Sequence, residues 1–350
     1  FSLLLIPSTP EEQLQCARNY SARLERAVTR ERGRLGFRFD RRPGSKLRIG
    51  YLSGDFRDHP AAYLIAELIE LHDRGRFEIA AYSYGPNDGS AIRARLARAF
   101  DRFVDLSALS HADAASRIHG DRTDILLDLT GYTSRARAEI LALRPAPVQV
   151  NFLGYPGTMG AGFIDYLISN RFMTPASHAA HFSEKLVLLP GSHQVNDRQR
   201  AVAETQPRAK LGLPEKAFVF CCLNQTNKIL PDVFATWMRL LLGTPSSVLW
   251  LVDNGSLATG NLRAEAEKRG VPPERLVFAP RVPIAQHLAR LRAADLFLDT
   301  LPYNAHSTTS DALWVGLPVL TCVGNTFTSR MAGSMLNLIG LPELITYCLA

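Results

Sequence analysis

The chain has 350 residues, of which 46% are hydrophobic and 21% charged; this excludes a wholly disordered protein and fits about two globular domains. It contains no uninterrupted apolar run of the roughly 18 residues that a transmembrane helix needs, so we expect no membrane partner. The net charge of +7 comes from arginines scattered along the chain. Because they form no basic run, we expect no nucleic-acid partner either.

The cysteine pattern bears on metal sites and on the cellular compartment. The five cysteines are odd in number and show no CxxC or Cys/His ligand spacing. We therefore expect reduced cysteines, a cytoplasmic protein and no metal site. The chain starts at Phe1, with no basic segment before its first apolar residues, so we expect no signal peptide and a piece of a longer protein.

The first half of the chain predicts one long helix and then alternating strands and helices. The helix covers about residues 11–30 and belongs to an N-terminal helical segment, 1–46. The strands predicted within residues 47–190 are 47–53, 77–85, 102–107, 124–131, 148–157, 165–170 and 185–190, with helices at 60–73, 91–100, 113–120 and 137–145. Such alternation predicts a doubly wound parallel α/β sheet.

A second alternating region follows a polar stretch, 191–214, which lacks periodicity and is expected to be a linker. The strands predicted within residues 215–350 are 217–224, 247–254, 276–280, 296–300 and 318–324, with helices at 231–243, 258–270, 284–294, 308–315 and 328–340. Fully apolar runs such as FVFCC suit strands that are covered on both faces. We expect a second Rossmann-like domain, truncated at its end, and a cleft at the carboxyl ends of the strands.

Two loops of the first half follow predicted strands and carry groups that suit a binding or catalytic site. Asp55 and His59 come after the first strand, just before a helix, and Gly154, Tyr155 and Pro156 begin the glycine-rich turn that follows residues 148–153 of the fifth strand-like run. Taken alone, Asp55 is more typical of a turn or a helix cap than of a catalytic group, and His59 is as typical of a structural histidine as of a functional one. Both readings stay open at this point.

Two loops of the second half suit a phosphate. Gln225 and Lys228 lie in NQTNK after the first strand, and His306, Ser307 and Thr308 lie in NAHSTTSD after the fourth. A lysine ammonium, hydroxyl groups and the free N–H groups at the start of a helix all bind phosphate. The hydroxyl groups would also suit a simple helix cap, but the position of both loops at strand ends favours a ligand site.

Several long stretches resemble the catalytic region of bacterial O-linked N-acetylglucosamine transferases, and the resemblance covers nearly the whole chain. They include LRIGYLSGDFRDHP, LRPAPVQVNFLGYPGTMGAGFIDYLIS, FVFCCLNQTNKILPDVFATWM and DLFLDTLPYNAHSTTSDALWVGLPVLT. The resemblance implies the GT-B fold, with two Rossmann-like domains facing a cleft. It also implies inverting, metal-independent transfer of GlcNAc from UDP-GlcNAc to protein Ser and Thr hydroxyls, without a cofactor. Tetratricopeptide repeats are then expected in the full-length chain, with residues 1–46 as the end of that repeat region.

Carried over position by position, the resemblance assigns the nucleotide to the second half. Lys228 would stabilise the departing UDP, and Gln225 would also reach the diphosphate. The other contacts would come from His306, Ser307 and Thr308 at the diphosphate, Asp311 at the ribose, and His287, Arg290 and the backbone of Val282 at the uracil.

In the first half, the resemblance places His59 and the Gly154–Tyr155–Pro156 turn near the sugar and the acceptor, and assigns Asp55 to proton removal. The catalytic residues would then be His59, Lys228 and Asp55. Two alternatives stay open: the same fold with another donor, such as GDP-fucose, and a degenerate protein that binds nucleotides or other proteins without transfer.

Overall fold

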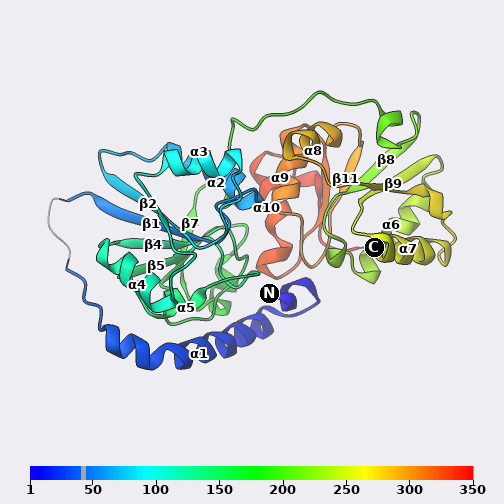
Figure 1. The fold of residues 1–350 in the computed structure, drawn as a ribbon. Helices are drawn as coiled ribbons and strands as arrows, with labels where there is room; N and C mark the ends of the chain where they lie inside the picture. Colours follow the sequence, from blue (N-terminus) through cyan, green and yellow to red (C-terminus); the bar gives the residue numbers. More distant parts are fainter. Residues whose placement is uncertain (41–44, 350) are drawn as a thin grey trace. The chain divides into compact units, whose positions relative to one another are not determined.

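The computed structural model describes residues 1–40 and 45–349; residues 41–44 of the predicted N-terminal segment and residue 350 lie outside the described residues. The chain divides into two compact units (Figure 1). Unit 1 contains Phe1 and residues 8–199, and unit 2 contains residues 2–7 and the chain from Arg200 onward. The division falls inside the predicted linker, 191–214.

Unit 1 is built on a seven-stranded parallel sheet in the order β3-β2-β1-β4-β5-β6-β7. The strands are β1 (Leu47–Ser53), β2 (Phe77–Ser83), β3 (Arg102–Asp105), β4 (Ile125–Asp128), β5 (Val148–Asn151), β6 (Tyr166–Asn170) and β7 (Lys185–Leu189). The helices are α1 (Pro10–Leu35), α2 (Pro60–Glu70), α3 (Ala91–Ala99), α4 (His111–Gly120), α5 (Ala138–Ala142) and the 3-10 helix η2 (Ala176–His181). The strand order reverses between β1 and β4, so their carboxyl ends form a topological switch point.

Helix α1 is an integral part of unit 1 and is longer than predicted. It begins with a capping box, in which the Thr9 hydroxyl accepts from the Glu12 amide at 3.2 Å and the Glu12 carboxylate accepts from the Thr9 amide at 2.7 Å. Its Ser21 hydroxyl donates to the Gly160 carbonyl at 2.7 Å. A Cβ on Gly160 would lie 2.5 Å from the amide nitrogen of Arg18, so only glycine permits this approach.

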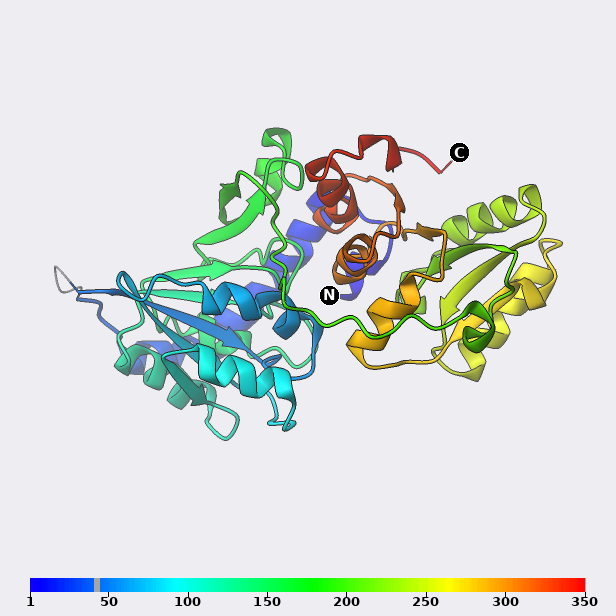
Figure 2. The same ribbon diagram turned by 90° about the horizontal axis from the view of Figure 1, so that it is seen from above.

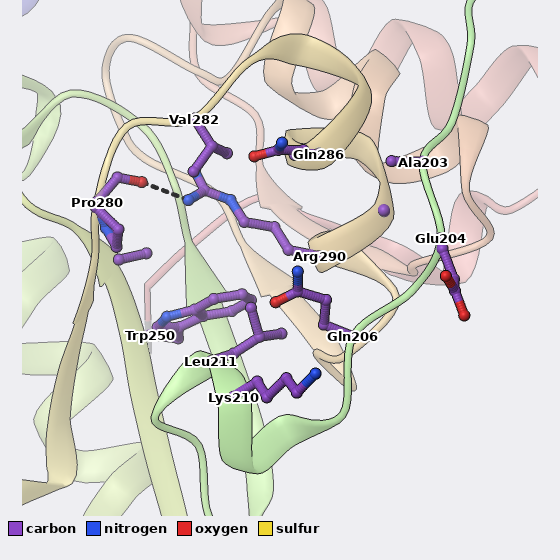
Figure 3. Close-up of a pocket in the computed structure, with 12 residues that line it drawn as sticks. Ala203, Glu204, Gln206, Lys210, Leu211, Trp250, Pro280, Val282, Gln286 and Arg290 are labelled. Atoms are coloured by element: carbon purple, nitrogen blue, oxygen red, sulfur yellow. Dashed lines mark hydrogen bonds between the residues drawn. The ribbon is translucent and has the colours of Figure 1, made fainter.

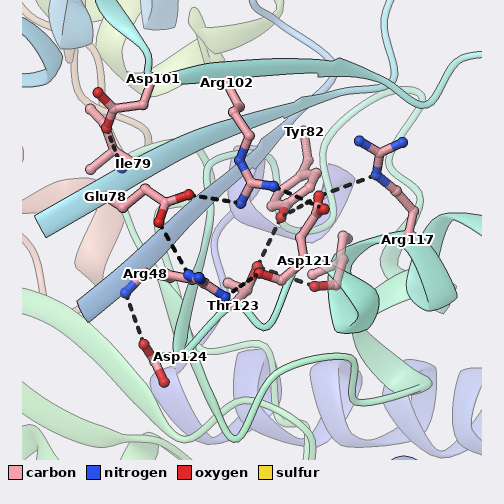
Figure 4. A network of polar contacts seen from close by, with 11 residues as sticks. Arg48, Glu78, Ile79, Tyr82, Asp101, Arg102, Arg117, Asp121, Thr123 and Asp124 are labelled. Atoms are coloured by element: carbon pink, nitrogen blue, oxygen red, sulfur yellow. Dashed lines mark hydrogen bonds and ion pairs between the residues drawn. The ribbon is translucent and has the colours of Figure 1, made fainter. Parts of the chain in front are cut away.

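Charged side chains pair across the amino-terminal edge of the same sheet (Figure 4). Glu78 of β2 lies 3.1 Å from the guanidinium of Arg48 in β1 and 3.2 Å from that of Arg102 in β3. Arg102 also pairs with Asp121, just after α4, at 3.0 Å. Opposite charges on neighbouring strands favour one register. These pairs therefore align the strands at the edge opposite to the carboxyl ends, where the predicted site residues follow.

Unit 2 repeats this architecture with a parallel sheet in the order β10-β9-β8-β11-β12-β13. The strands are β8 (Phe218–Cys222), β9 (Ser247–Val252), β10 (Leu276–Ala279), β11 (Leu296–Leu298), β12 (Val319–Cys322) and β13 (Ile345–Thr346). The helices are α6 (Pro231–Gly243), α7 (Ser256–Glu267), α8 (Ile284–Leu291), α9 (Ser307–Trp314) and α10 (Met331–Leu338). The 3-10 helices are η1 (Ser2–Leu5), η3 (Arg208–Leu211), η4 (Thr226–Lys228), η5 (Pro273–Arg275), η6 (Phe327–Ser329) and η7 (Pro342–Leu344). The order reverses between β8 and β11, which gives unit 2 its own switch point.

The predicted fold class, α/β with two doubly wound parallel sheets, is confirmed; within each unit, the sheet and its flanking helices can also be followed in a second view (Figure 2). Cys221, Leu249, Phe297 and Val319 come from four strands of unit 2 and are all fully buried, as the apolar runs predicted. None of the helices in the described ranges is long and apolar enough to cross a bilayer.

The largest difference from the predicted elements lies after β5. The strand predicted over 148–157 ends at Asn151, because the chain turns back and the Asn151 side-chain amide donates to the Gly157 carbonyl at 3.1 Å. Leu153 takes a left-handed backbone conformation, with a φ of 66° that a strand cannot contain. The short strand β13 was not predicted.

Candidate functional site

Lys228 lies at the switch point of unit 2, in the loop that follows β8. Its Nζ donates to the Asn304 carbonyl at 3.1 Å and lies 4.0 Å from the centroid of the Tyr303 ring. Burial lowers the pKa of Lys228 to about 8, although the Asp299 carboxylate works in the opposite direction. An ammonium has three N–H donors, and the described residues supply one acceptor. The cation is thus held in place with donors available for an anion.

The start of α9 faces the same loop. The Thr308 hydroxyl donates to the Asn224 side-chain carbonyl at 2.5 Å, and the Asn224 amide donates to the Thr300 hydroxyl at 3.1 Å. His306, the residue before α9, stacks on Tyr303 with 4.7 Å between ring centroids and makes no side-chain cap bond. The N–H groups that open the helix carry its positive dipole end. These contacts join the loops after β8 and β11 into one set.

Asp299, which the sequence analysis did not single out, fixes the loop between β11 and α9. Its carboxylate accepts from the Ala305 amide at 2.6 Å, the Thr321 hydroxyl at 2.6 Å and the Thr300 amide at 2.7 Å. Burial raises the pKa of Asp299 to about 6, against these hydrogen bonds. A carboxylate within the apolar run LFLDT was the signal that could have identified it. Gln225 stands in the neighbouring loop and is exposed.

His287, Arg290 and Asp311 form a second cluster in unit 2, between α8 and α9. The Arg290 guanidinium donates to the His287 Nδ1 at 3.0 Å and to the Pro280 carbonyl at 2.5 Å. Because Nδ1 accepts, neutral His287 carries its proton on Nε2, which lies 3.9 Å from the Asp311 carboxylate. Burial lowers the pKa of His287 to about 4 and raises that of Asp311 to about 6.

A pocket of about 370 Å³ opens beside this cluster (Figure 3). Its lining comprises Ala203, Glu204, Gln206, Lys210 and Leu211 of the linker segment, Trp250 and Ala279 from strands, and Pro280, Val282, Gln286, Ala289 and Arg290 around α8. The Arg290 guanidinium lies 5.9 Å from the centroid of the Trp250 ring. Trp250 is only 1% exposed and belongs to the core of unit 2, so the accessible lining comes from the linker segment and the residues around α8. A concave lining with a few polar groups suits a small ligand. Trp250 lies in the apolar run VLWLV, so the sequence predicts only a core residue at this position.

The site residues predicted in unit 1 lie at its own switch point. His59 caps α2: its Nδ1 accepts from the Ala61 amide at 3.3 Å and lies 3.8 Å from the Asp55 carboxylate. Arg57 pairs with Asp55 at 2.9 Å. Burial is the main cause that lowers the pKa of His59, and Asp55 acts against it. Near neutral pH His59 is therefore uncharged and, with Nδ1 occupied, carries its proton on Nε2.

The turn Gly154–Tyr155–Pro156 packs against the loop that follows β4. A Cβ on Gly154 would lie 1.8 Å from the Leu129 carbonyl oxygen, so the close approach requires glycine. Tyr155 and Pro156 are buried, and the Tyr155 ring lies 5.4 Å from that of Tyr132. The turn thus shapes the backbone beside the switch point of unit 1. Nowhere in residues 1–40 and 45–349 do three or more His, Cys, Asp or Glu side chains gather in a way that could hold a metal ion.

A family of known proteins matches most of the chain. The model of glycosyl transferase family 41 matches residues 4–209 and 200–348. The probable UDP-N-acetylglucosamine–peptide N-acetylglucosaminyltransferase SEC of Arabidopsis thaliana is 36% identical over 353 residues, covering 97% of this chain and 36% of the plant protein. The UDP-N-acetylglucosamine–peptide N-acetylglucosaminyltransferase of Caenorhabditis elegans is 30% identical, covering 88% of this chain and 37% of the relative.

A solved structure is similar as well. A mutant of the O-GlcNAc transferase of Thermobaculum terrenum superposes with a TM-score of 0.82 and 33% sequence identity, over 89% of this chain and 59% of that one. The chain spans little more than a third of the length of the two curated relatives.

Proposed function

The chain belongs to glycosyl transferase family 41, and from this we propose that it is the catalytic region of an enzyme that moves N-acetylglucosamine from UDP-GlcNAc to protein Ser and Thr hydroxyls. The observation that carries the proposal is the cation at the switch point of unit 2. Lys228 is held by the Asn304 carbonyl beside the start of α9, with N–H donors to spare. We infer that this cation and the start of α9 bind the diphosphate that is the leaving group of the reaction.

The chemistry explains why such a cation would accelerate transfer. As the bond between the anomeric carbon and the diphosphate oxygen breaks, negative charge grows on the diphosphate. Only contacts that strengthen in the transition state speed the reaction, and a fixed ammonium with helix N–H groups does so without reorganising. We propose that Lys228, Gln225, His306, Ser307 and Thr308 supply this stabilisation, so that transfer needs no metal.

The rest of the donor would be bound by the second cluster of unit 2. Asp311 would hold ribose hydroxyls, and the backbone of Val282, together with His287 and Arg290, would surround the uracil. The pocket beside Val282 and Arg290 supports this assignment, because its concave lining combines apolar side chains with a guanidinium that can donate to the carbonyl oxygens of a base.

We propose that unit 1 handles the acceptor, with inversion at the anomeric carbon and with the Gly154–Tyr155–Pro156 turn beside the sugar. In its capping tautomer His59 offers an N–H at Nε2, which suits orienting the sugar or the acceptor oxygen. To take the proton of the hydroxyl at Nε2, His59 would need its own proton on Nδ1, where Asp55 at 3.8 Å would stabilise it. Asp55 then acts through His59.

The setting of this region is also part of the proposal. The chain covers 36% of its Arabidopsis relative, so we propose a longer protein in which tetratricopeptide repeats precede the catalytic region and present protein substrates. Free cysteines at Cys16, Cys221, Cys222, Cys322 and Cys348 support a cytoplasmic enzyme.

The test is a donor comparison. Purified protein is incubated with a Ser- and Thr-rich peptide and either UDP-GlcNAc or GDP-fucose, with and without EDTA. The mass of the peptide is then measured by mass spectrometry. We expect one N-acetylhexosamine per modified site from UDP-GlcNAc only, at the same rate with EDTA. Transfer of fucose instead would mean that the donor is GDP-fucose and not UDP-GlcNAc. Binding of UDP by calorimetry without transfer from either donor would favour a nucleotide-binding module, and no UDP binding would reject the site.

A further inference from the structure

A buried ion pair joins the linker segment to α9 within unit 2. The guanidinium Nη1 of Arg200 lies 2.5 Å from the carboxylate of Asp311, and the two side chains are only 4% and 8% exposed. The backbone continues along α8, where the Ala203 amide donates to the Ala285 carbonyl at 3.0 Å. In the sequence, residue 200 falls inside the predicted linker, 191–214, where no pattern marks it.

The guanidinium of Arg200 is incompletely satisfied. Its Nε and Nη2 are buried and have no hydrogen-bond partner among the described residues. The guanidinium lies 4.9 Å from the centroid of the Trp314 ring, which stabilises positive charge but accepts no N–H bond as a carbonyl would. Leaving charged donors buried without acceptors is costly, so such groups in a folded protein call for an explanation.

The position of the pair suggests which acceptors are missing. Asp311 follows Thr308 by one turn of α9, and its other carboxylate oxygen lies 3.9 Å from His287. The pair thus stands between the proposed phosphate groups at the start of α9 and the base pocket beside α8. In a nucleoside diphosphate the part between base and phosphate is the ribose.

The chemistry of the pair agrees with this position. A vicinal diol both donates and accepts hydrogen bonds, so it is best bound by an acceptor and a donor side by side. Asp311 is acceptor-only when ionised, and Arg200 is donor-only. The ion pair holds the two groups in a fixed relation, with the Nε and Nη2 atoms of Arg200 uncommitted.

We propose that Arg200 is a nucleotide-binding residue that acts with Asp311 to bind the ribose diol of the donor. The inference rests on the proposed function, because it needs a nucleotide in unit 2. It makes the linker segment a part of the donor site and gives the enzyme a way to prefer ribonucleotides over deoxyribonucleotides.

The test compares nucleotides that differ only in the diol. UDP, 2′-deoxy-UDP and 3′-deoxy-UDP are titrated by calorimetry into the wild-type protein and into Arg200→Met and Arg200→Lys. Arg198→Met is the matched control, because Arg198 lies two residues away, is 71% exposed and pairs with Glu67 instead. Thermal melting of each variant reports whether it is folded.

We expect the wild type and Arg198→Met to prefer UDP over at least one deoxy form by on the order of tenfold. Arg200→Met should weaken the binding of UDP by about tenfold or more. The affinity ratio between UDP and the deoxy forms should then approach one, because the deoxy forms lose little affinity. Arg200→Lys keeps the charge but not the planar fork, so it should recover only part of the preference. Should Arg200→Met fail to fold, Arg200→Lys carries the comparison.

Two outcomes would overturn the inference. One is equal weakening of all three nucleotides in the folded Arg200 variants, with the wild-type preference kept, because that is what a purely structural ion pair would produce. The other is a wild type that binds UDP but shows no preference over either deoxy form. A wild type that binds no UDP rejects the proposed function itself, which separates the two failures.

Discussion

The side chain of Lys228 is buried, and burial disfavours its charged form. The pKa of its ammonium is lowered to about 8 by desolvation, and the buried Asp299 offsets only part of that effect. Since the ordinary pKa is 10.5, the unfolded chain binds this proton more tightly than the folded one does, so the charged lysine costs stability at neutral pH. A group that is costly for the fold and poised beside an anion site has the character of a functional residue.

Replacing the cation should separate activity from stability. We expect Lys228→Met to lower transfer by on the order of 10²–10³-fold or more, because the leaving diphosphate loses its fixed positive charge. The melting temperature should stay the same or rise, since a desolvated charge is removed. Lys216→Met, at an exposed lysine, serves as the control for both measurements.

Turnover by Lys228→Met close to that of the wild type would contradict the leaving-group role. A fall in melting temperature of several degrees would instead indicate that Lys228 mainly holds the loop through the Asn304 carbonyl.

The pH profile of kcat/KM should reflect the same residue. The ammonium of Lys228 is present below about pH 8 and is lost as the pH rises through that value, so kcat/KM should fall on the alkaline side. The carboxylate of Asp311 has a pKa raised to about 6, so it is ionised above that pH and its ribose contact is lost as the pH falls. The measurement is a steady-state profile from pH 5 to 10 at subsaturating donor.

A comparison of kcat with kcat/KM would distinguish this origin from general instability. The alkaline limb of kcat should lie at higher pH than that of kcat/KM, because a bound diphosphate holds the proton on Lys228. A profile that stays flat up to pH 10 would show that the lysine charge does not limit transfer.

At the scale of elements, His59 has two roles: it is the N-cap of α2 and a proposed catalytic residue. The His59 imidazole accepts from the Ala61 amide, and Pro60 occupies the first helical position, so this one residue both starts the helix and carries a candidate catalytic group. Substitutions can separate the two roles, because asparagine is a good N-cap without an imidazole.

We expect His59→Ala to lower stability by about 1 kcal/mol through loss of the cap and to reduce transfer strongly. His59→Asn should recover most of the stability but none of the transfer. UDP binding should change little in either variant, since the proposed nucleotide site lies in unit 2. Chemical denaturation, peptide glycosylation and calorimetry measure the three properties.

Transfer restored by His59→Asn along with stability would reduce His59 to a structural cap. A loss of UDP affinity comparable to the loss of transfer would move His59 away from the acceptor side.

The sequence predicted the regular elements well, because apolar strand runs and helical periodicity are local signals. Strand β1 and helix α6 agree with their predicted bounds, whereas the strand predicted over 148–157 failed where a side chain and a left-handed residue turn the chain. The turn depends on contacts that no local pattern records.

The candidate site was predictable to the extent that its residues follow strands or open helices. Lys228 and Thr308 were found in this way, and they lie in adjoining loops. Arg200 was missed because its partner is 111 residues away, and Trp250 because an aromatic residue in a buried strand is indistinguishable from core. Pairing across a long separation in sequence is a tertiary property.

At the scale of the whole chain, two units with the same strand reversal each offer one switch point. Unit 1 carries His59 and Asp55 after β1, and unit 2 carries Lys228 after β8 and the α9 start after β11. Ligands of doubly wound sheets bind where the strand order reverses, which explains why both sets of candidate residues follow these strands. The sequence shows no internal repeat, so the shared topology does not depend on shared side chains.

This division of labour predicts where a nucleotide alone should protect the chain. We expect UDP to slow amide hydrogen exchange in residues 224–228 and 304–311 of unit 2, because the diphosphate orders the loops after β8 and β11. Residues 54–61 of unit 1 should respond only when a donor that still carries its sugar is bound. Peptides from the charged edge around Arg48 and Glu78 provide the internal control, since they lie at the opposite end of their strands. Equal protection of residues 54–61 by UDP alone would mean that the nucleotide is not confined to unit 2, and the assignment of leaving group and acceptor to separate units would then be wrong.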